Sequence, residues 1–456
     1  MPTVMKFGGT SVADAHAFEN VARIVASQSN AAPVVVVSAM GGVTDVLLAA
    51  TVAAGEGRPD DAIASLEQTY RRHRQTAEQL LTPKAAQAFA QQVDKAATKI
   101  DELLRLSAGD PLRRHAIQDA VLSFGEMLSS ELLAELLSQR GLKAQHVDAR
   151  RCIVTDDQHT CALPLMPDTL FKANEALTPA IENGFIPVLG GFIAATQDGT
   201  TTTLGRGGSD YTAALIGAAL TADEIQIWTD VTGVLTADPR VVPEAQTVER
   251  LSYAEASELA YFGAKVLHPK TIQPAIEGSI PVRICNSRAP EQIGTLVGPQ
   301  TETTNRTIKA IAHKGGVTTV QITSARMLGA YGFLRALFEV FERHRTVVDV
   351  VATSEVSVSL SLDDDSALPV IVQELEQLGT VRVETNCAIV CVVGEGLRGT
   401  PGIAARVFSA ISDINVTLIS QGASSINFTF AIEEEFAQEA VRRLHTEFFV
   451  NCGLNG

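Results

Sequence analysis

The sequence predicts an α/β protein: a mostly parallel sheet covered by helices, followed by a smaller α/β module that is used twice. Apolar runs without polar alternation, such as residues 34–37, are separated by longer helical patterns, which is typical of parallel strands buried on both faces. Near the C-terminus, residues 331–360 match residues 401–430 without a gap, which indicates an internal repeat. The register is carried by Gly332, Phe338 and Ser354 and their counterparts Gly402, Phe408 and Ser424.

The first expected strand, residues 4–7, runs into Gly8 and Gly9 and then into a helix from about Asp14. Glycines after a strand let backbone N–H groups approach an anion, and a helix N-terminus favours negative charge. Lys6 lies at the end of this strand. The spacing matches neither the P-loop nor the dinucleotide fingerprint, so an ordinary tight turn explains the glycines equally well.

Further strands are expected at 34–37, 185–189, 224–228 and 280–284, and each ends in a polar or glycine-rich turn. Ligands of parallel sheets bind beyond the carboxyl ends of the strands, where these turns lie. Between them, the segment from about 55 to 140 is rich in Ala, Gln, Leu and Glu. We interpret it as a helical insertion, with helices at 60–81 and 85–106 and a break at 109–111.

The stretch 200–212 combines threonines and glycines with Arg206 and Asp210, just before a helix that begins near Ser209. An arginine there can hold a carboxylate through two hydrogen bonds, and Asp210 can orient a lysine or a metal ion. A helix cap alone explains Asp210 but not the glycines and the arginine together. Glu126 follows Phe124 and Gly125, where we expect a helix start; charge at a helix N-terminus is its simplest explanation.

Composition narrows the class of protein. The formal net charge of −16 disfavours nucleic acid or an acidic membrane as the main partner. The six cysteines form no CxxC pair, so we expect reduced, mostly buried thiols and a cytoplasmic location. The histidines show no ligand spacing, so the protein should have no metal site of its own. Neither a signal peptide nor an apolar run long enough for a membrane span is expected.

Taken together, these motifs resemble the aspartate kinase family and occur in that family's order. The matching segments are 6–11 (KFGGTS), Ser38 and Ala39 with Thr44, 123–126 (SFGE), 201–210 (TTTLGRGGSD), 228–231 (WTDV) and 262–269 (FGAKVLHP). The resemblance covers essentially the whole chain. It implies an amino-acid kinase fold over 1–300, with the helical insertion at about 55–140, and two ferredoxin-like ACT domains at 310–385 and 386–456. Family members with one ACT unit nested in the other leave the boundary between the two open.

The resemblance also implies an activity. The γ-phosphoryl group of ATP would move to the β-carboxylate of L-aspartate, giving 4-phospho-L-aspartate, the first step of lysine, threonine and methionine biosynthesis, with Mg²⁺ carried by the ATP. The acceptor carboxylate is already ionised, so the reaction needs positioned cations rather than a general base. The implied catalytic residues are Lys6 and Asp210, which holds Lys6. The implied substrate-binding residues are Thr44, Glu126, Arg206 and Ser209, with Arg206 on the α-carboxylate and Glu126 on the α-ammonium group. The implied nucleotide-binding residues are Lys6, Gly8, Gly9, Thr229, Asp230, Arg240, Lys265 and Val266.

The first repeat resembles the effector-binding unit of lysine-inhibited family members, which implies L-lysine as a feedback inhibitor. The corresponding residues are Met327, Gly332, Phe333, Leu334, Asp349, Ser354 and Glu355. Asp349 and Glu355 offer negative charge to a lysine ammonium group. ACT units usually pair across subunits, so a homodimer or higher homo-oligomer is expected. The chain departs from the family pattern at Leu235, where an aromatic residue is common, and at Ala330, where some lysine-sensitive relatives carry a hydroxyl.

Three alternatives are weighed against this interpretation. A kinase of the same fold acting on glutamate, acetylglutamate or a nucleotide is disfavoured by the repeat and by the segment 262–265. A catalytically inactive amino-acid sensor is disfavoured because Lys6, Arg206, Asp210 and Lys265 are all present. A kinase half of a longer fusion enzyme would require a dehydrogenase-like glycine motif after the second repeat, and none follows.

Overall fold

The computed structural model describes residues 1–262, 267, 269–299, 307–329, 331–422 and 424–450. The chain divides into two compact units. The first comprises Met1–Val234 and Val266–Gln300, and the second comprises Leu235–Lys265 and Thr301–Gly456. Within the described residues, no helix combines the length and the apolar character needed to span a membrane.

The first unit is built on a sheet whose strands run in the order β3-β5-β2-β1-β8-β10-β11. Neighbouring strands are parallel except for β10 and β11, which are antiparallel. The predicted mostly parallel sheet is therefore confirmed. The strands are β1 (Thr3–Phe7), β2 (Val34–Val37), β3 (Ala144–His146), β5 (Ile186–Gly190), β8 (Glu224–Thr229), β10 (Val282–Asn286) and β11 (Thr295–Gly298). A smaller sheet has the order β4-β6-β7 and consists of β4 (Val154–Thr155), β6 (Ile193–Thr196) and β7 (Thr201–Thr203).

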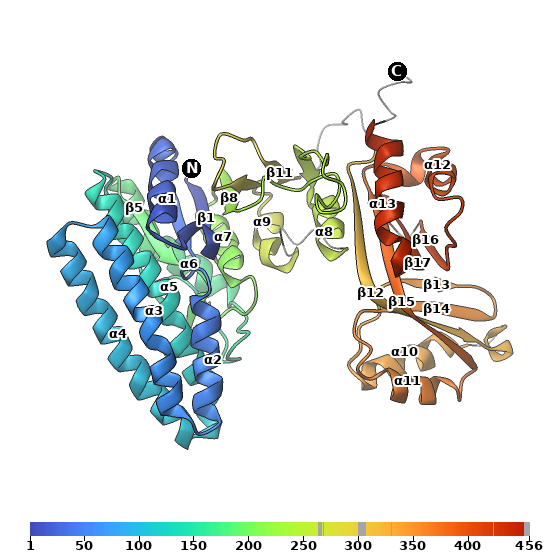
Figure 1. The fold of residues 1–456 in the computed structure, drawn as a ribbon, viewed down its shortest axis with the longest axis horizontal. Helices are drawn as coiled ribbons and strands as arrows, with labels where there is room; N and C mark the ends of the chain where they lie inside the picture. The colour runs from blue at the N-terminus through green and yellow to red at the C-terminus, as the bar shows by residue number, and fades with distance from the viewer. Residues whose placement is uncertain (263–266, 268, 300–306, 330, 423, 451–456) are drawn as a thin grey trace. The chain divides into compact units, whose positions relative to one another are not determined.

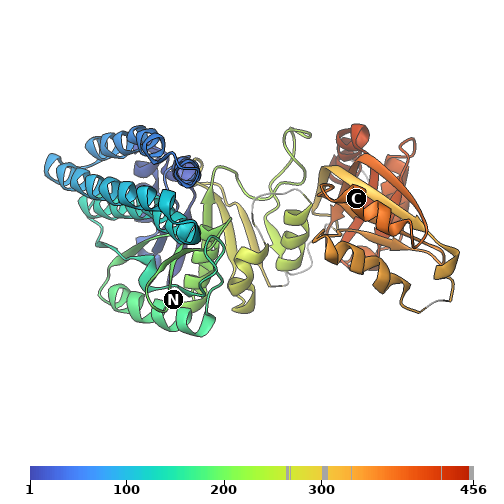
Figure 2. The same cartoon turned by 90° about the horizontal axis from the view of Figure 1, so that it is seen from below.

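Helices surround this sheet (Figure 1). α5 packs against β3 and β5, while the long helices α3 and α4 pack on one another and on α2 and α5; Figure 2 shows this helical group from below. The predicted helices at 60–81 and 85–106 correspond to α3 and α4. The helices are α1 (Ala15–Ser27), α2 (Val43–Gly55), α3 (Pro59–Leu80), α4 (Pro83–Gly109), α5 (Arg114–Gln139), α6 (Met166–Glu182), α7 (Gly208–Ala219) and α9 (Gln273–Glu277).

The expectation of a helix start at Glu126 is wrong, because Glu126 lies in the middle of α5. Gly125 serves close packing instead of ending or starting a helix. A Cβ atom placed on Gly125 would lie 2.9 Å from the Cβ atom of Ala39, which is closer than such atoms approach. The glycine therefore allows α5 to lie directly against the loop that follows β2.

The second unit contains one sheet with the order β13-β14-β12-β15-β17-β16. Its strands are β12 (Ala310–Thr323), β13 (Val351–Thr353), β14 (Ser357–Leu362), β15 (Thr380–Val393), β16 (Leu418–Gln421) and β17 (Asn427–Glu433); the short strand β9 (Arg250–Ser252) is not part of this sheet. The helices of the second unit are α8 (Tyr253–Tyr261), α10 (Phe333–Arg343), α11 (Leu368–Leu375), α12 (Ile403–Ala410) and α13 (Ala437–His445). A helix and two strands follow β12 and follow β15, in agreement with the repeat in the sequence.

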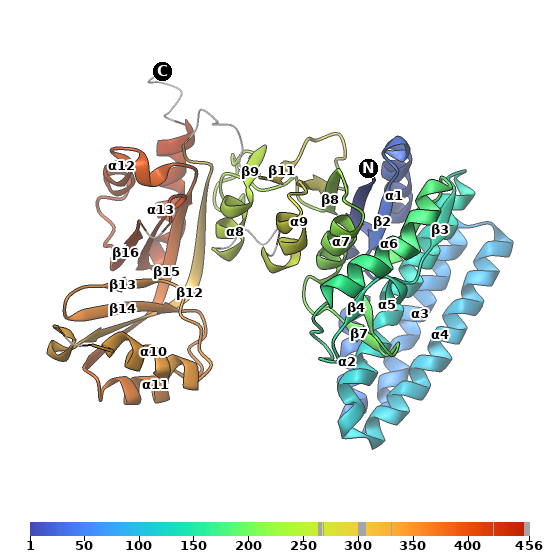
Figure 3. The same ribbon diagram turned by 180° about the vertical axis from the view of Figure 1, so that it is seen from behind.

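The long antiparallel strands β12 and β15 run side by side through the second unit (Figure 3). Their register shifts between Lys314 and Val317, at a β-bulge or irregularity. Before the shift, β12 pairs with the part of β15 that also pairs with β17; after it, β12 pairs with β14. Each half of the sheet has its own apolar core, one containing Phe428 and Phe430 and the other containing Val320 and Phe341.

Candidate active site

An open cavity of about 360 Å³ lies beyond the carboxyl ends of β1, β2 and β5 in the first unit. This is the edge of the sheet at which the sequence predicts a ligand. The lining residues are Lys6, Gly9, Ser38, Ala39, Met40, Gly41, Gly42, Thr44, Asp45, Glu126, Phe192, Gly205, Arg206, Gly207, Gly208, Ser209 and Asp210. The structure therefore brings together all six residues predicted for catalysis and for substrate binding.

Lys6 and Asp210 form an ion pair in this cavity. Lys6 is the penultimate residue of β1, and its Nζ lies 2.5 Å from Oδ1 of Asp210. Asp210 lies in the first turn of α7, where a negative charge interacts favourably with the helix dipole. Both side chains are largely buried, with 11% of the lysine and 18% of the aspartate side chain exposed. The carboxylate therefore fixes the direction of an ammonium group that still reaches the cavity.

Two glycines explain how α7 approaches the sheet so closely. Gly207 precedes the helix with φ of +77°, a left-handed conformation that favours glycine. A Cβ atom on Gly191, which follows β5, would lie only 2.7 Å from the Cβ atom of Ser209. The glycines in the predicted motifs thus bring the helix N-terminus, with its free N–H groups, next to the strand ends.

Glu126 enters the cavity from α5 as a buried carboxyl group, with 3% of the residue exposed. Burial raises its pKa to about 8, and the hydrogen bond from the backbone amide of Ala39 opposes that shift only in part. The Oε2 atom of Glu126 has no hydrogen-bond partner among the described residues. A buried acceptor that faces a cavity without a partner is suited to a cationic ligand group, because the cation would restore the lost solvation.

Arg206 and Thr44 also line the cavity. Arg206 is exposed, and its guanidinium group has no ion-pair partner among the residues that the structure describes. It follows Gly205 in the loop between β7 and α7. A free guanidinium group and a buried, unpartnered carboxyl group in one cavity are complementary to the two charged groups of an amino-acid backbone.

The residues predicted for the nucleotide are less concentrated. The amide of Gly8 donates to the carbonyl oxygen of Trp228 at 3.1 Å, which continues the pairing of β1 with β8 and leaves that N–H unavailable for a phosphate. Thr229 is the last residue of β8 and Asp230 follows it. Their side chains are hydrogen bonded to each other at 3.2 Å. Arg240 belongs to the second unit, where it pairs with Asp238. Lys265 and Val266 lie outside the described residues.

The predicted effector residues all lie in the second unit: around the start of α10, in the turn between β13 and β14, and, for Asp349, just before β13. Gly332 precedes α10 with φ of +81°. Burial raises the pKa of Asp349 to about 7, and the neighbouring Asp363 carboxyl group adds to the shift. Ser354 accepts a hydrogen bond from the amide of Ser357 within its own turn. Met327 lies in a short helical turn, Phe333 and Leu334 open α10, and Glu355 is exposed.

Other lining residues were not predicted. Met40, Asp45 and Phe192 carry no motif of their own, and only their position after a buried strand could have indicated them. Among the described residues, no group of three or more His, Cys, Asp or Glu side chains is arranged to hold a metal ion.

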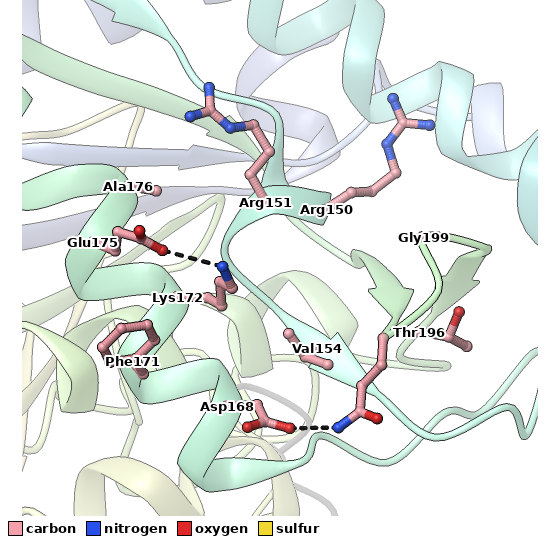
Figure 4. Close-up of a pocket in the computed structure, with 11 residues that line it drawn as sticks. Arg150, Arg151, Val154, Asp168, Phe171, Lys172, Glu175, Ala176, Thr196 and Gly199 are labelled. Atoms are coloured by element: carbon pink, nitrogen blue, oxygen red, sulfur yellow. Dashed lines mark hydrogen bonds and ion pairs between the residues drawn. The ribbon is translucent and has the colours of Figure 1, made fainter.

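A second, larger cavity of about 780 Å³ lies between α6 and the small sheet. Two interactions join residues of its lining: Lys172 pairs with Glu175 at 3.2 Å, as Figure 4 shows, and Gln197 donates to Asp168 at 2.8 Å. The guanidinium groups of Arg150 and Arg151 point in different directions. None of the predicted site residues lines this cavity, so the smaller cavity at the strand ends is the better candidate for catalysis.

The fold and the cavity define a kinase that acts on an amino acid. Residues 1–286 match the model of the Amino acid kinase family, and residues 390–448 match an ACT domain model. The chain is 37% identical over 455 residues to "Lysine-sensitive aspartokinase 3" of Escherichia coli, covering 98% of this chain and 99% of that protein. It is 38% identical over 469 residues to "Aspartokinase 1, chloroplastic" of Arabidopsis thaliana, covering 99% and 81% respectively.

Solved structures agree with this result. The structure of E. coli aspartokinase III in complex with aspartate and ADP is similar with a TM-score of 0.82 and 37% identity, covering 98% of this chain and all of the other. The structure of the same protein with lysine and aspartate has a TM-score of 0.81. The chain belongs to the aspartokinase family. It is an ATP-dependent kinase with a C-terminal ACT region.

Proposed function

We propose that the chain transfers the γ-phosphoryl group of ATP to the β-carboxylate of L-aspartate in the cavity at the ends of β1, β2 and β5. The single observation that carries this proposal is the meeting of Lys6, Glu126, Arg206 and Asp210 in one cavity. Arg206 would bind the α-carboxylate of aspartate, and Glu126 would bind its α-ammonium group. Thr44 and Ser209 would supply hydroxyl groups to the same substrate.

Lys6 would then neutralise negative charge on the phosphoryl group as it is transferred from ATP to aspartate. Its pairing with Asp210 holds the ammonium group in place before the reaction, so that little reorganisation is needed in the transition state. No general base is required, because the attacking β-carboxylate is already ionised at neutral pH. The product, 4-phospho-L-aspartate, is an acyl phosphate, and it would enter lysine, threonine and methionine biosynthesis.

The nucleotide would be contacted by Lys6, Gly8, Gly9, Thr229, Asp230, Arg240, Lys265 and Val266. Because the Gly8 amide is engaged with Trp228, Gly8 would contribute through its lack of a side chain, which lets the phosphates approach the backbone. Mg²⁺ would enter with ATP, held chiefly by phosphate oxygens and water, and it would neutralise phosphate charge when bound.

The second unit would bind L-lysine as an inhibitor at the residues around α10 and Asp349, and it would pair with a second copy of the chain through its ACT domains. The relative with a lysine-bound structure supports the choice of effector. We further propose a catalytic domain over 1–300 and two ACT domains over 310–385 and 386–456. The first would be nested within the second if the start of β12, Ala310–Lys314, is counted with the second, because it pairs with the end of β15. A cytoplasmic location remains a prediction.

The test is ADP release from Mg-ATP with L-aspartate, L-glutamate or acetylglutamate as the acceptor, with and without millimolar L-lysine. Turnover that depends on aspartate and is suppressed by lysine would support both parts of the proposal. Turnover without suppression would leave the kinase activity and remove the lysine site. Folded protein without aspartate-dependent turnover would overturn the kinase proposal. The variant Lys6→Met serves as the control for contaminating activity.

A further inference from the structure

Asp119 is a completely buried carboxyl group on α5 that plays no part in the chemistry described above. It lies about two helical turns before Glu126, and therefore on nearly the same face of the helix. Its Oδ1 accepts a hydrogen bond from Oγ1 of Thr203 at 2.5 Å. Its Oδ2 lies 2.7 Å from Nδ1 of His159, which donates when the carboxyl group is ionised.

A third donor is the backbone amide of Thr160, which lies 3.0 Å from Oδ2 and 3.1 Å from Oδ1 of Asp119. Thr160 adopts φ of +72°, a left-handed conformation that is unfavourable for a β-branched residue. Such a conformation persists only where its surroundings hold it. The two contacts from its amide to Asp119 provide that restraint.

The segment held by Asp119 supports the substrate loop directly. The amide of Ala162 donates to the carbonyl oxygen of Thr203 at 2.9 Å. A Cβ atom on Gly205 would lie 3.2 Å from the carbonyl oxygen of Thr160 and 3.4 Å from Sγ of Cys161. The backbone at Gly205 therefore rests on residues 160–161, and the next residue is Arg206.

We propose that Asp119 is a positioning residue for aspartate binding, which fixes Arg206 relative to Glu126 by tying both to α5. Glu126 is carried by this helix itself. Arg206 is tied to the same helix by two routes. Thr203, three residues before Arg206, donates to Asp119, and Thr160, which also donates to Asp119, packs against the backbone of Gly205. The two groups proposed to hold the substrate's opposite charges thus share one support. This inference rests on the proposed function, and it assigns Asp119 no contact with substrate.

Thr202 offers a matched control, because it makes an equally buried hydrogen bond from the adjacent position of the same strand. Its Oγ1 lies 2.7 Å from Oγ1 of Thr155, and among the described residues the hydrogen bonds of Asp119 come from His159, Thr160 and Thr203 and not from this pair. Thr202→Val and Thr203→Val each remove one hydroxyl from β7 while keeping the shape of the side chain. Only the second variant loosens the connection from β7 to α5.

The experiment compares wild-type enzyme with Asp119→Asn, Thr203→Val and Thr202→Val, using kcat, the KM values for aspartate and ATP, and Tm. Since hydrogen bonds to charged groups are the stronger ones, we expect Asp119→Asn and Thr203→Val to raise KM for aspartate about tenfold. KM for ATP should change less than about twofold in the same variants. Thr202→Val should also lower Tm, by less than Thr203→Val because its partner is a neutral hydroxyl, and it should leave KM for aspartate unchanged.

Each outcome is decisive. If both KM values rise together, or if Thr202→Val has the same effect on aspartate as Thr203→Val, the role of Asp119 is merely structural and the inference is wrong. If Asp119→Asn does not fold, Thr203→Val alone decides the matter. Wild-type enzyme that shows no aspartate-dependent turnover overturns the proposed function and this inference together, whereas active wild-type enzyme with unchanged variants overturns this inference alone.

Discussion

Nζ of Lys6 lies 2.5 Å from Oδ1 of Asp210, so the carboxyl end of β1 and the first turn of α7 are joined by one ion pair at the cavity. Replacing Lys6 with Met should lower kcat by about 100-fold or more, because a cation aimed at developing negative charge is removed. Steady-state ADP release measures this effect.

The control for this change is Lys172→Met, which breaks an exposed pair with Glu175 and should leave kcat unchanged. A variant Lys6→Met that retains more than half of the wild-type kcat would show that the lysine only stabilises the fold. The kcat of Asp210→Asn should lie between the values for Lys6→Met and Lys172→Met, because the ammonium group of Lys6 remains but loses the carboxylate that holds it.

Glu126 should make the stability of the ligand-free protein depend on pH. Burial raises its pKa from the ordinary 4.5 to about 8. The folded state therefore favours the protonated carboxyl group, and this contribution is complete below the ordinary pKa and is lost as pH rises through about 8. The free energy of unfolding should fall across that range, and Glu126→Gln should remove much of the fall. Urea denaturation at a series of pH values measures it.

The same group should couple aspartate binding to proton release. The α-ammonium group of aspartate prefers the ionised form of Glu126, so binding should expel a proton below pH of about 8 and become tighter as pH rises to that value. Calorimetric titration in buffers of different ionisation enthalpy counts the protons. Binding enthalpies that do not vary with the buffer would contradict the assignment of Glu126 to the ammonium group.

Lysine inhibition should also depend on pH, through Asp349. Burial, together with the neighbouring Asp363, raises the pKa of Asp349 to about 7. A lysine ammonium group binds the ionised carboxylate, so the lysine concentration needed for half inhibition should decrease as pH rises through about 7. Asp349→Asn should weaken inhibition and flatten this dependence, while aspartate turnover without lysine stays near the wild-type value. Equal inhibition of both proteins would remove Asp349 from the effector site.

Lys309 and Glu255 form an ion pair in the second unit with 4% and 0% of their side chains exposed. Lys309→Met should destabilise this unit by about 3–5 kcal/mol, because it leaves a carboxylate buried without its partner. The double variant Glu255→Gln, Lys309→Met should recover most of the loss, since glutamine can keep the capping contact that Glu255 makes with Ser252.

Chemical denaturation of the full chain distinguishes the two variants. Lys99→Met breaks an exposed pair with Glu102 and should change the free energy of unfolding by less than about 1 kcal/mol. A double variant that is no more stable than Lys309→Met would show that the packing of the lysine stem, and not the stranded charge, accounts for the loss.

The sequence predicted the parallel sheet and the cavity because both depend on local patterns. Buried strands end at glycine turns, and the carboxyl ends of parallel strands meet at one edge, so Lys6, Arg206 and Asp210 could be expected to converge. Glu126 was placed at the wrong point of its helix, because Gly125 was interpreted as a boundary and its true role is a contact with Ala39 across the fold.

Asp119 was missed for a related reason. A single aspartate in an apolar helix carries no periodic or motif signal, and its partners Thr160 and Thr203 are separated from it by 41 and 84 positions in the chain. Only the folded arrangement shows what such a residue holds. The predicted boundary between the ACT domains at 385–386 falls inside β15, because the change from polar to buried apolar residues at Cys387 occurs within one continuous strand.

The sharing of β12 and β15 sets an order for the synthesis of the second unit. The first segment of β12 to leave the ribosome, Ala310 to Lys314, pairs with Ile389 to Val393, which follow only after the whole of α10, α11 and the strands between them. The later segment of β12, Thr318 to Thr323, pairs with β14 and with the start of β15, which are synthesised before Ile389 to Val393. Because domains fold as they emerge during translation, the inner module can close while the outer one still waits for its last strand and helix.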